Sequence, residues 1–345
     1  MKKPIIPFAL FLGLSGLISC SQNQSNGEQK DTEIAAVPSI QTIAFGSCNK
    51  HDLPQPLWEP ILEEHPDVWI WLGDNVYGDT QDMELLKTKY DSQYDQEGYA
   101  MIRKTTQVIG TWDDHDFGIN DGGVNFAKKK ESQQIMLNFL EEPENTPRRA
   151  QEGVYTVHEF GEGEQKVNIY LLDTRYHRDT LEKEADNYVP NTEGTILGEE
   201  QWQWLEEEFL HSDARINIIA SGIQFIAEEH PYEKWANFPK EREKLMKLIA
   251  DSGLQSPVLI SGDRHIGEMA KTQLPNGKDI YEITSSGLTH TWNEWRPEDN
   301  KYRVAGDHIA ELHYGLVSID WEKEAMEFSI KGEDKKTHLN QAIQF

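Results

Sequence analysis

Metal-ligand side chains follow several apolar segments of the chain at the point where each segment ends. In the stretch Pro66–Thr80, the apolar run Val68–Leu72 is followed at once by Gly73, Asp74 and Asn75. A short, nearly unbroken apolar run is typical of a strand buried on both faces of a sheet. A carboxylate and an amide just beyond such a strand, on a loop that glycine makes flexible, are suited to a hard metal ion.

The same arrangement recurs after other predicted strands. The residues concerned are Cys48, the cluster Asp113–Asp121, Gln224, and Asp263 with His265. In an open α/β sheet the carboxyl ends of the strands line one crevice, so groups far apart in the sequence can meet there. Without cations, repulsion among so many carboxylates would force some of them to take up protons. Two or three metal ions would remove that repulsion and would supply what hydrolysis of a phosphate ester needs.

Each of these loops also has a structural interpretation. An isolated Asp-x-His such as Asp263–His265 is more often a turn or a satisfied hydrogen-bonded pair than a metal site. The run Asp113–Asp116 is equally compatible with a solvated loop. Cys48 has no intramolecular disulfide partner if Cys20 is modified, so it is a packed thiol, a free thiol or a ligand. The recurrence at five strand ends favours a metal centre.

The elements that must position these loops alternate between strands and helices. The predicted strands are Thr42–Phe45, Val68–Leu72, Val108–Trp112, Val154–Phe160, Val167–Leu172, Ile216–Ala220, Pro257–Ser261, Asp279–Thr284, Gly315–Ile319 and Met326–Ile330. The predicted helices are Leu57–Leu62, Met83–Tyr94, Tyr99–Thr105, Glu131–Glu141, Glu199–Leu210 and Pro239–Ile249, and Asp179–Leu197 is predicted to be irregular. This alternation predicts an α/β domain, and the hairpins predict mixed sheets.

The first twenty residues have the features of a bacterial export signal. Lys2 and Lys3 precede the apolar run Ile5–Leu17, and the ending Leu17–Cys20 resembles a lipobox. An ordinary signal peptide with a chance cysteine is the alternative. The predicted organisation is a lipoprotein signal peptide over residues 1–19, a flexible tether over 20–39 and one folded domain over 40–345. We therefore expect the protein to be exported and held to the cell envelope, in the periplasm or at the cell surface.

The charge of the chain limits its partners. The formal net charge is −27, and loss of Lys2 and Lys3 with the signal would make it −29. Such acidity argues against nucleic-acid binding, which needs a basic surface, and against electrostatic adhesion to anionic lipid. Membrane contact is therefore expected only through lipid on Cys20, and the sequence implies no protein partner. An acidic enzyme that acts on phosphate esters needs local cations, which again indicates metals.

Taken together, the motifs resemble those of the PhoD-like alkaline phosphatases, a family of the metallophosphatase superfamily. The matching motifs are Phe45–Cys48, Leu72–Tyr77, Thr111–Asp116, Leu172–Arg175 and Ser261–His265. The resemblance extends from about Ile40 to Ile330. It implies an α/β/β/α sandwich, in which two mixed sheets pack face to face with helices outside. Asn75 is a departure, because family members commonly have tyrosine at that position.

The resemblance also implies a set of metals and ligands. It implies Fe3+ held by Cys48 and a tyrosine, and Ca2+ or other divalent cations held by oxygen ligands, with Asp74 bridging. Thiolate and phenolate suit ferric iron, whereas carboxylates and amides suit hard divalent ions. Tyr90 is the best match for the tyrosine, and Tyr94 is an alternative. The remaining ligand positions match Asn120, Gln224, Asp263 and His265.

For the mechanism we expect in-line attack of a metal-bridging hydroxide on phosphorus. Arg175, with Arg264, is expected to hold the non-bridging phosphate oxygens, because guanidinium matches their geometry. A buried salt bridge to Asp173 is the structural alternative for Arg175. His115 is the candidate general acid for the leaving alkoxide, with Asp113 or Asp114 orienting it.

The sequence leaves the substrate open between small-molecule phosphate monoesters and diesters. A phosphodiesterase or phospholipase using the same site is therefore an alternative to a phosphatase. A non-catalytic surface lipoprotein that binds glycans through its tryptophans is an alternative from another class. The ligand-rich loops oppose that alternative, because a binding module would not need them.

Overall fold

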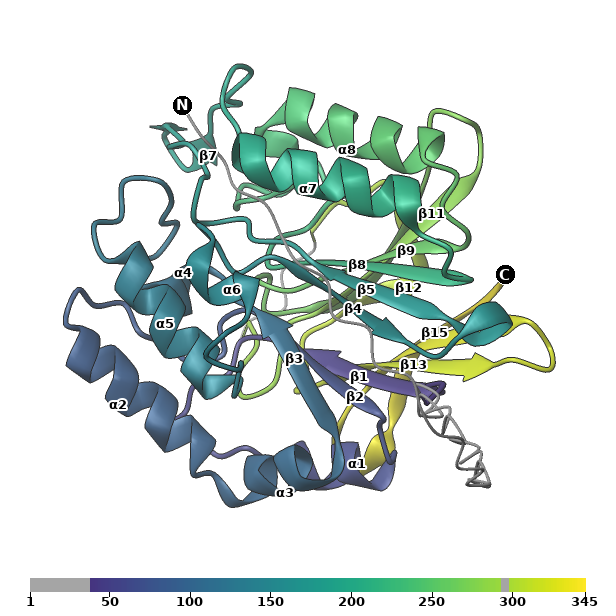
Figure 1. The fold of residues 1–345 in the computed structure, drawn as a ribbon, viewed down its shortest axis with the longest axis horizontal. Coiled ribbons are helices and arrows are strands. Elements are labelled where there is room, and N and C mark those ends of the chain that lie inside the picture. Colours follow the sequence, from purple (N-terminus) through teal and green to yellow (C-terminus); the bar gives the residue numbers. More distant parts are fainter. Residues whose placement is uncertain (1–37, 293–297) are drawn as a thin grey trace, which may run out of the picture. The chain divides into compact units, whose positions relative to one another are not determined.

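Two large mixed sheets form the centre of the structure, a computed structural model that describes residues 38–292 and 298–345 (Figure 1). The six-stranded sheet contains, in spatial order, β15 (Thr337–Gln344), β14 (Ala325–Lys331), β13 (Tyr314–Asp320), β1 (Thr42–Gly46), β2 (Val68–Leu72) and β3 (Gln107–Thr111). The seven-stranded sheet contains β12 (Arg303–Ile309), β10 (Gly267–Gln273), β11 (Asp279–Ser285), β9 (Pro257–Ser261), β8 (Ile216–Ser221), β5 (Val167–Leu171) and β4 (Thr156–Phe160).

Each sheet combines a parallel part with antiparallel strands. In the six-stranded sheet β1, β2 and β3 are parallel, while β13, β14 and β15 add antiparallel strands on one side. In the seven-stranded sheet β5, β8, β9 and β11 are parallel, and β4, β10 and β12 are the antiparallel strands. The prediction of mixed sheets is therefore confirmed. The carboxyl ends of the parallel strands carry the loops that were predicted to hold ligands.

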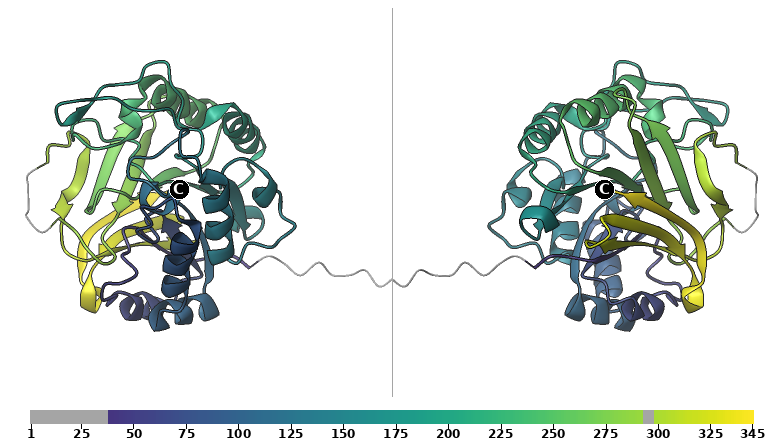
Figure 2. Two further views of the ribbon diagram at one scale, coloured as in Figure 1. Left: turned by 90° about the vertical axis from the view of Figure 1, so that its left-hand side faces the viewer. Right: turned by 90° about the vertical axis from the view of Figure 1, so that its right-hand side faces the viewer.

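Helices cover the outer face of each sheet. The helices on the six-stranded sheet are α1 (Trp58–Glu63), α2 (Met83–Tyr94), α3 (Glu97–Thr105) and α5 (Lys129–Phe139). Those on the seven-stranded sheet are α7 (Gly198–His211) and α8 (Pro239–Asp251). The two turned views show the sheets facing each other between these helix layers (Figure 2). The α/β/β/α sandwich expected from the sequence is thus the observed fold.

Strand β2 shows why its sequence is apolar throughout. Val68, Ile70 and Leu72 belong to the core between the two sheets, whereas Trp69 and Trp71 belong to the core under the helices. All five side chains are fully buried. Because burial of each such side chain contributes roughly 1.5–3 kcal/mol, polar residues on either face would be costly.

Several strands of the structure were not predicted from the sequence. Strands β10, β12 and β15 had not been predicted, and a small hairpin of β6 (Lys183–Glu184) and β7 (Asn187–Tyr188) lies inside the segment predicted to be irregular. In β10 the buried Glu268 forms an ion pair with Arg303 at 3.0 Å. A strand whose buried positions include a paired carboxylate lacks the apolar pattern by which strands are recognised.

The predicted signal peptide, the lipidation site Cys20 and the tether up to residue 37 lie outside the described residues. Within the described part of the chain, none of the helices has the length and apolar character needed to cross a membrane.

Candidate functional site

The loops that follow β1, β2, β3 and β9 meet at one edge of the sandwich. They carry Cys48, Asp74, Asp113 and Asp263 respectively. Across this edge the hydroxyl of Thr111, the last residue of β3, donates a hydrogen bond of 2.8 Å to the carbonyl oxygen of Leu172. The two sheets are therefore linked directly beside the loops, which brings ligands from both sheets together.

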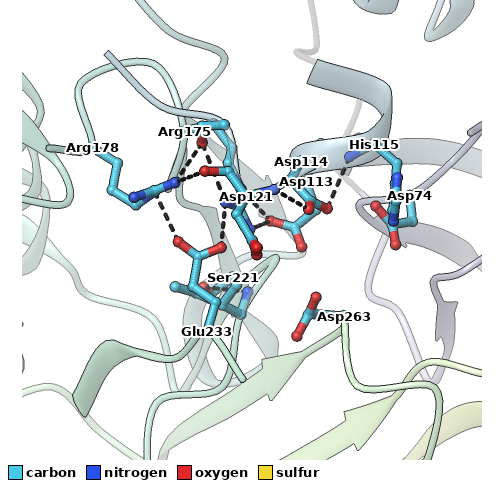
Figure 3. A network of polar contacts seen from close by, with 12 residues as sticks. Asp74, Asp113, Asp114, His115, Asp121, Arg175, Arg178, Ser221, Glu233 and Asp263 are labelled. Carbon is cyan, nitrogen blue, oxygen red and sulfur yellow. Dashed lines mark hydrogen bonds and ion pairs between the residues drawn. The ribbon is translucent and has the colours of Figure 1, made fainter. Parts of the chain in front are cut away.

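Ligand atoms from these loops form three overlapping groups, in each of which the atoms lie within 4.8 Å of one another. The groups are Cys48 with Asp74 and His265, Asp74 with Asp114 and His115, and Asp113 with Asp114 and Asp263. Asp74 belongs to two groups and Asp114 also belongs to two, so neighbouring groups share a carboxylate. Figure 3 shows the acidic part of this arrangement, with Asp263 facing the Asp113–Asp114 pair from the opposite sheet.

Four of the converging residues have a left-handed backbone conformation. The φ angles are 60° for Cys48, 50° for Asp74, 69° for Asp263 and 54° for His265. Residues other than glycine adopt such angles at a cost of roughly 1–3 kcal/mol, so they persist only where the surrounding structure enforces them. Their concentration at one site is typical of functional loops.

Glycine is required at one position between these loops. Gly73 has a φ of +92°, and a Cβ atom there would lie 2.4 Å from the Cβ of Asp113. Any larger residue would therefore push the loop after β2 away from the loop after β3. The Gly-Asp pair thus reflects a steric need as well as a ligand.

Asp116 holds the loops after β2 and β3 together. Its carboxylate accepts hydrogen bonds from the backbone N–H groups of Asp74 (3.1 Å), Asn75 (3.2 Å) and Asp113 (2.7 Å), and from the hydroxyl of Tyr90 (3.0 Å). Burial raises the pKa of Asp116 to about 7, although these hydrogen bonds lower it. Tyr90 therefore supports the loops through Asp116, whereas the family resemblance implies that Tyr90, or alternatively Tyr94, binds iron together with Cys48.

Tyr77 is the tyrosine that joins the Cys48 group. Its hydroxyl lies 3.2 Å from Oδ2 of Asp74 and 3.0 Å from Nε2 of His265. Sγ of Cys48 lies 3.5 Å from the same oxygen of Asp74. Sequence reasoning missed Tyr77, although a signal was present, because it lies three residues after Asp74 in the same loop.

Gln224 lies in a separate polar network. Its amide nitrogen donates to Glu268 (2.6 Å) and to Thr284 (2.9 Å), and its carbonyl oxygen lies 3.0 Å from Nε2 of His230. These contacts engage both ends of the amide, so in this structure Gln224 is held by hydrogen bonds to other side chains. Asn120, by contrast, is exposed and lines the cavity described below.

Arg175 is not available to hold a phosphate in this structure. Its guanidinium is completely buried and forms ion pairs with Asp113 at 2.6 Å and with Glu233 at 2.5 Å (Figure 3). The expected clamp on phosphate oxygens has no counterpart in these contacts, and the ion-pair partners of the guanidinium are Asp113 and Glu233, whereas Asp173 accepts a hydrogen bond from the backbone N–H of Arg175. By neutralising Asp113, Arg175 reduces the repulsion between that carboxylate and its acidic neighbours.

His115 is held by a carboxylate that the sequence had not suggested. Nδ1 of His115 lies 2.8 Å from Asp79, and the imidazole ring lies against Tyr77 with 4.2 Å between ring centroids. Burial alone would lower the pKa of His115, but Asp74, Asp79 and Asp114 raise it to about 10. The side-chain contact that orients the ring is thus with Asp79, whereas the sequence had suggested Asp113 or Asp114.

The ligand groups open into a cavity of about 600 Å³. Asp114, His115, Asn120, Asp263 and His265 line the part of the cavity nearest these groups. The β6–β7 hairpin lies on another side of it. A solute in this cavity can therefore reach the ligand atoms.

The model of the PhoD-like phosphatase family matches residues 43–330 of this sequence. The chain belongs to this family. It is 23% identical over 275 residues to alkaline phosphatase D of Bacillus subtilis (strain 168), in an alignment that covers 67% of the chain and 46% of the relative. The chain thus spans about half the length of that curated relative.

Two solved structures show the same fold as this PhoD-like chain. A structure of PhoD matches 90% of the chain and 69% of its own length, with a TM-score of 0.73 and 17% identity. A dimetal phosphatase from Danio rerio matches 89% of the chain and 99% of its own length, with a TM-score of 0.56 and 13% identity. Both comparisons support the metallophosphatase-type sandwich.

The donor set of this PhoD-like site fits bound cations. Burial, followed by the neighbouring charge of Asp74, raises the pKa of the Cys48 thiol well above its ordinary value, and burial likewise raises the pKa of Asp74. Oδ1 of Asp74 and Oδ2 of Asp113 are buried, and neither has a hydrogen-bond partner. Unpaired buried carboxylate oxygens are costly, and a cation would satisfy them. The residues present therefore suit a metal centre.

Proposed function

We propose that this protein is a metal-dependent hydrolase of phosphate esters. The observation that carries the proposal is the set of three ligand groups joined by the shared carboxylates Asp74 and Asp114. Shared carboxylates between neighbouring cation positions are the arrangement by which multi-metal sites act on a single phosphate. Membership of the PhoD-like phosphatase family agrees with this activity.

The chemistry of the donors suggests which cations bind where. Cys48, Tyr77 and His265 with Asp74 offer soft or phenolate donors, which favour Fe3+. The groups that contain Asp113, Asp114 and Asp263 offer carboxylates, which favour Ca2+ or another divalent cation. Such cations, when bound, supply an activated water and positive charge at the phosphate oxygens. Tyr77 therefore replaces Tyr90 as the proposed phenolate ligand.

The chain itself supplies the groups that bind and protonate. His115 lines the cavity, and its contact with Asp79 fixes the ring, so it is the proposed general acid for the leaving oxygen. Arg264 lines the cavity and, without Arg175, remains the proposed contact for phosphate oxygens, in which it would exchange its ion pair with Glu298, 2.6 Å away, for the phosphate. Asp113 is now proposed as a cation ligand whose charge Arg175 partly neutralises, instead of as the residue that orients His115.

The substrate is proposed to be a small-molecule phosphate ester, either a monoester or a diester. The alternative of a glycan-binding protein loses its support, because most described tryptophans are buried in the core: Trp58, Trp69, Trp71, Trp112, Trp202 and Trp235. Phosphodiesterase or phospholipase activity at the same site remains the second candidate, since the cavity has room for a substituent beside the phosphate.

The test is hydrolysis of 4-nitrophenyl phosphate and of bis(4-nitrophenyl) phosphate by the purified, metal-analysed protein. We expect turnover of at least one compound, loss of turnover with a chelator and recovery when metal is restored. The ratio of the two rates decides between monoester and diester preference. An intact, metal-loaded protein that hydrolyses neither compound would refute the proposal.

Substitution of proposed metal ligands tests whether hydrolysis takes place at this site. Asp74→Asn and Asp263→Asn should each lower kcat by at least about 1,000-fold and reduce the metal content, because each removes a negative donor. Asp320→Asn is a matched control, since Asp320 pairs with the exposed Lys323 on the surface at 2.6 Å. That variant should keep full activity and full metal content.

We further propose that the protein is exported and anchored by lipid on Cys20. This proposal rests on the sequence of residues 1–20 alone. In a bacterial host, the full chain should sediment with membranes, and Cys20→Ala should abolish incorporation of labelled fatty acid. Equal labelling of the variant and the unmodified chain would contradict the anchor.

A further inference from the structure

An aromatic surface adjoins the proposed metal site. Trp292 lies against His265, with ring centroids 5.1 Å apart, and it stacks on Tyr232 at 5.6 Å with an angle of 26° between the rings. Both aromatic residues line the cavity, and Trp292 is 38% exposed. A large aromatic side chain that stays exposed beside a candidate ligand is unusual, because such residues normally pack into the core.

The position of this surface is determined by several contacts. The indole N–H of Trp292 donates to the carbonyl oxygen of Arg264 at 2.9 Å, and the guanidinium of Arg264 lies 4.1 Å from the centre of the Tyr232 ring. Arg264 is in turn paired with Glu298 at 2.6 Å. Nζ of Lys234 donates to the carbonyl oxygen of Tyr232 at 3.0 Å. The aromatic pair is therefore preorganised before any ligand arrives.

The charges around the cavity restrict what can lie on this surface. Away from the ligand groups, Asp121, Asp186 and Glu233 line the cavity. Arg264 is the proposed contact for the phosphate itself, and Lys183 is paired with Asp121 at 3.3 Å. Glu233 is paired with Arg175 and Arg178, so a second anionic group on the substrate would meet charges that are already balanced and the carboxylate of Asp186. An uncharged substituent is therefore favoured in this part of the cavity.

We propose that Trp292, supported by Tyr232, is a binding platform for a flat, uncharged aromatic substituent of the phosphate ester. This rests on the proposed function, because it assumes that the phosphate lies at the ligand groups beside His265. The substituent then extends over the exposed indole face of Trp292. The stacked pair determines specificity by favouring planar groups over aliphatic groups of similar size.

The test compares three phosphonates that cannot be hydrolysed: phenylphosphonate, cyclohexylphosphonate and methylphosphonate. Their dissociation constants for the metal-loaded protein are measured by calorimetry. Phenylphosphonate should bind at least about fivefold more tightly than cyclohexylphosphonate, because only the planar ring can stack. Trp292→Ala should weaken phenylphosphonate about tenfold and leave methylphosphonate within about twofold, whereas Trp292→Phe should keep most of the preference.

Trp204→Ala is the matched control. Trp204 lies on α7, is half-buried and contacts Tyr155 instead of the cavity, so its loss should leave all three constants unchanged. Equal affinities of phenylphosphonate and cyclohexylphosphonate would overturn the proposal. An equal loss for all three compounds in the Trp292→Ala protein would overturn it as well. Because binding is measured without turnover, the platform can hold where the hydrolase proposal fails, and the reverse.

Discussion

Nδ1 of His115 lies 2.8 Å from the carboxylate of Asp79, and this contact joins the loop after β2 to the short helix α4 (Asp114–Phe117) after β3. The side chains of both residues remain partly exposed, at 19% for His115 and 43% for Asp79. A carboxylate that holds one imidazole nitrogen sets the direction of the other. Asp79 is therefore a positioning residue for the proposed general acid.

Replacing Asp79 by Asn should lower kcat by about 10- to 100-fold, because the neutral amide no longer stabilises the protonated form of His115 and holds the ring less firmly. The loss should be larger for an alkyl phosphate than for 4-nitrophenyl phosphate. Only the alkoxide leaving group needs a proton, so this contrast separates a proton-donor role from a structural one. The measurement is kcat for both substrates.

His115→Asn should show the same contrast between substrates, with a larger loss. Asp82→Asn provides the control, because Asp82 caps α2 in the same loop region without contacting His115. An equal loss on both substrates in the Asp79→Asn protein would contradict the role of His115 as the general acid.

The two tyrosines should differ in their effects on iron. Tyr77→Phe should remove the visible charge-transfer band of tyrosinate–Fe(III) and lower the iron content, since the hydroxyl of Tyr77 lies among Cys48, Asp74 and His265. Absorption spectra and metal analysis of the purified variant test this. A variant that retains the band would contradict Tyr77 as the ligand.

Tyr90→Phe should keep the iron and its band but lose stability. The variant removes a buried hydrogen bond of 3.0 Å to Asp116, so the free energy of unfolding should fall by about 1–2 kcal/mol. Denaturant unfolding of the metal-loaded protein measures the change. If the Tyr90→Phe protein lost the charge-transfer band although Tyr77 is unchanged, Tyr90 would be the iron ligand instead of Tyr77.

The fold could be predicted well where both faces of a strand are buried. The bounds of β2 and β9 agree residue for residue with the sequence prediction, because every buried position there is apolar or small. Strand β10 escaped prediction because Glu268 occupies a buried position, where its ion pair with Arg303 replaces apolar contact. A single sequence does not reveal such a pairing between distant residues.

The site could be predicted most directly for residues that closely follow a strand. Cys48, Asp74 and Asp263 come within two residues of a strand end, so the strand determines where they lie. Tyr90 lies on helix α2, and Gln224 lies three residues after β8, so the directions of both side chains depend on packing and hydrogen bonding. The α2 helix turns Tyr90 toward Asp116, and the side-chain amide of Gln224 donates to Glu268.

Arg175 should prove important for stability. Its ion pairs with Asp113 and Glu233 are buried on both sides, with side-chain exposures of 0–2%. Removal of Arg175 leaves the charge of Asp113 uncompensated, whereas Glu233 keeps an ion pair with Arg178 at 2.9 Å. Arg175→Met should therefore lower the free energy of unfolding by about 3–5 kcal/mol. A double-mutant cycle with Glu233→Gln should give a coupling energy above about 1 kcal/mol.

The matched control is the surface pair of Lys244 and Glu206, which are 2.9 Å apart with exposures of 44% and 46%. Its coupling energy should stay below about 1 kcal/mol, because solvent screens the charges. A coupling for Arg175 and Glu233 no larger than that of the surface pair would contradict the structural role.

His313 should make stability depend on pH below neutrality. Its Nε2 accepts the N–H of Ser286 at 3.1 Å, so the proton lies on Nδ1, which donates to the carbonyl oxygen of Glu311 at 2.8 Å. Burial lowers the pKa of His313 to about 4. The unfolded chain, with a pKa near 6.5, takes up this proton first as the pH falls.

The contribution of the neutral His313 to the free energy of unfolding is therefore fully present above about pH 6.5 and is lost as the pH falls toward 4. The free energy of unfolding should decrease by about 1.4 kcal/mol per pH unit over this window, or about 3 kcal/mol in all. His313→Gln should be less stable at pH 7 but should lack this part of the slope. His211→Gln, at the exposed end of α7, should keep the slope. A slope between pH 6.5 and 4 that is identical in the His313→Gln and unmodified proteins would show that the buried imidazole does not stay neutral.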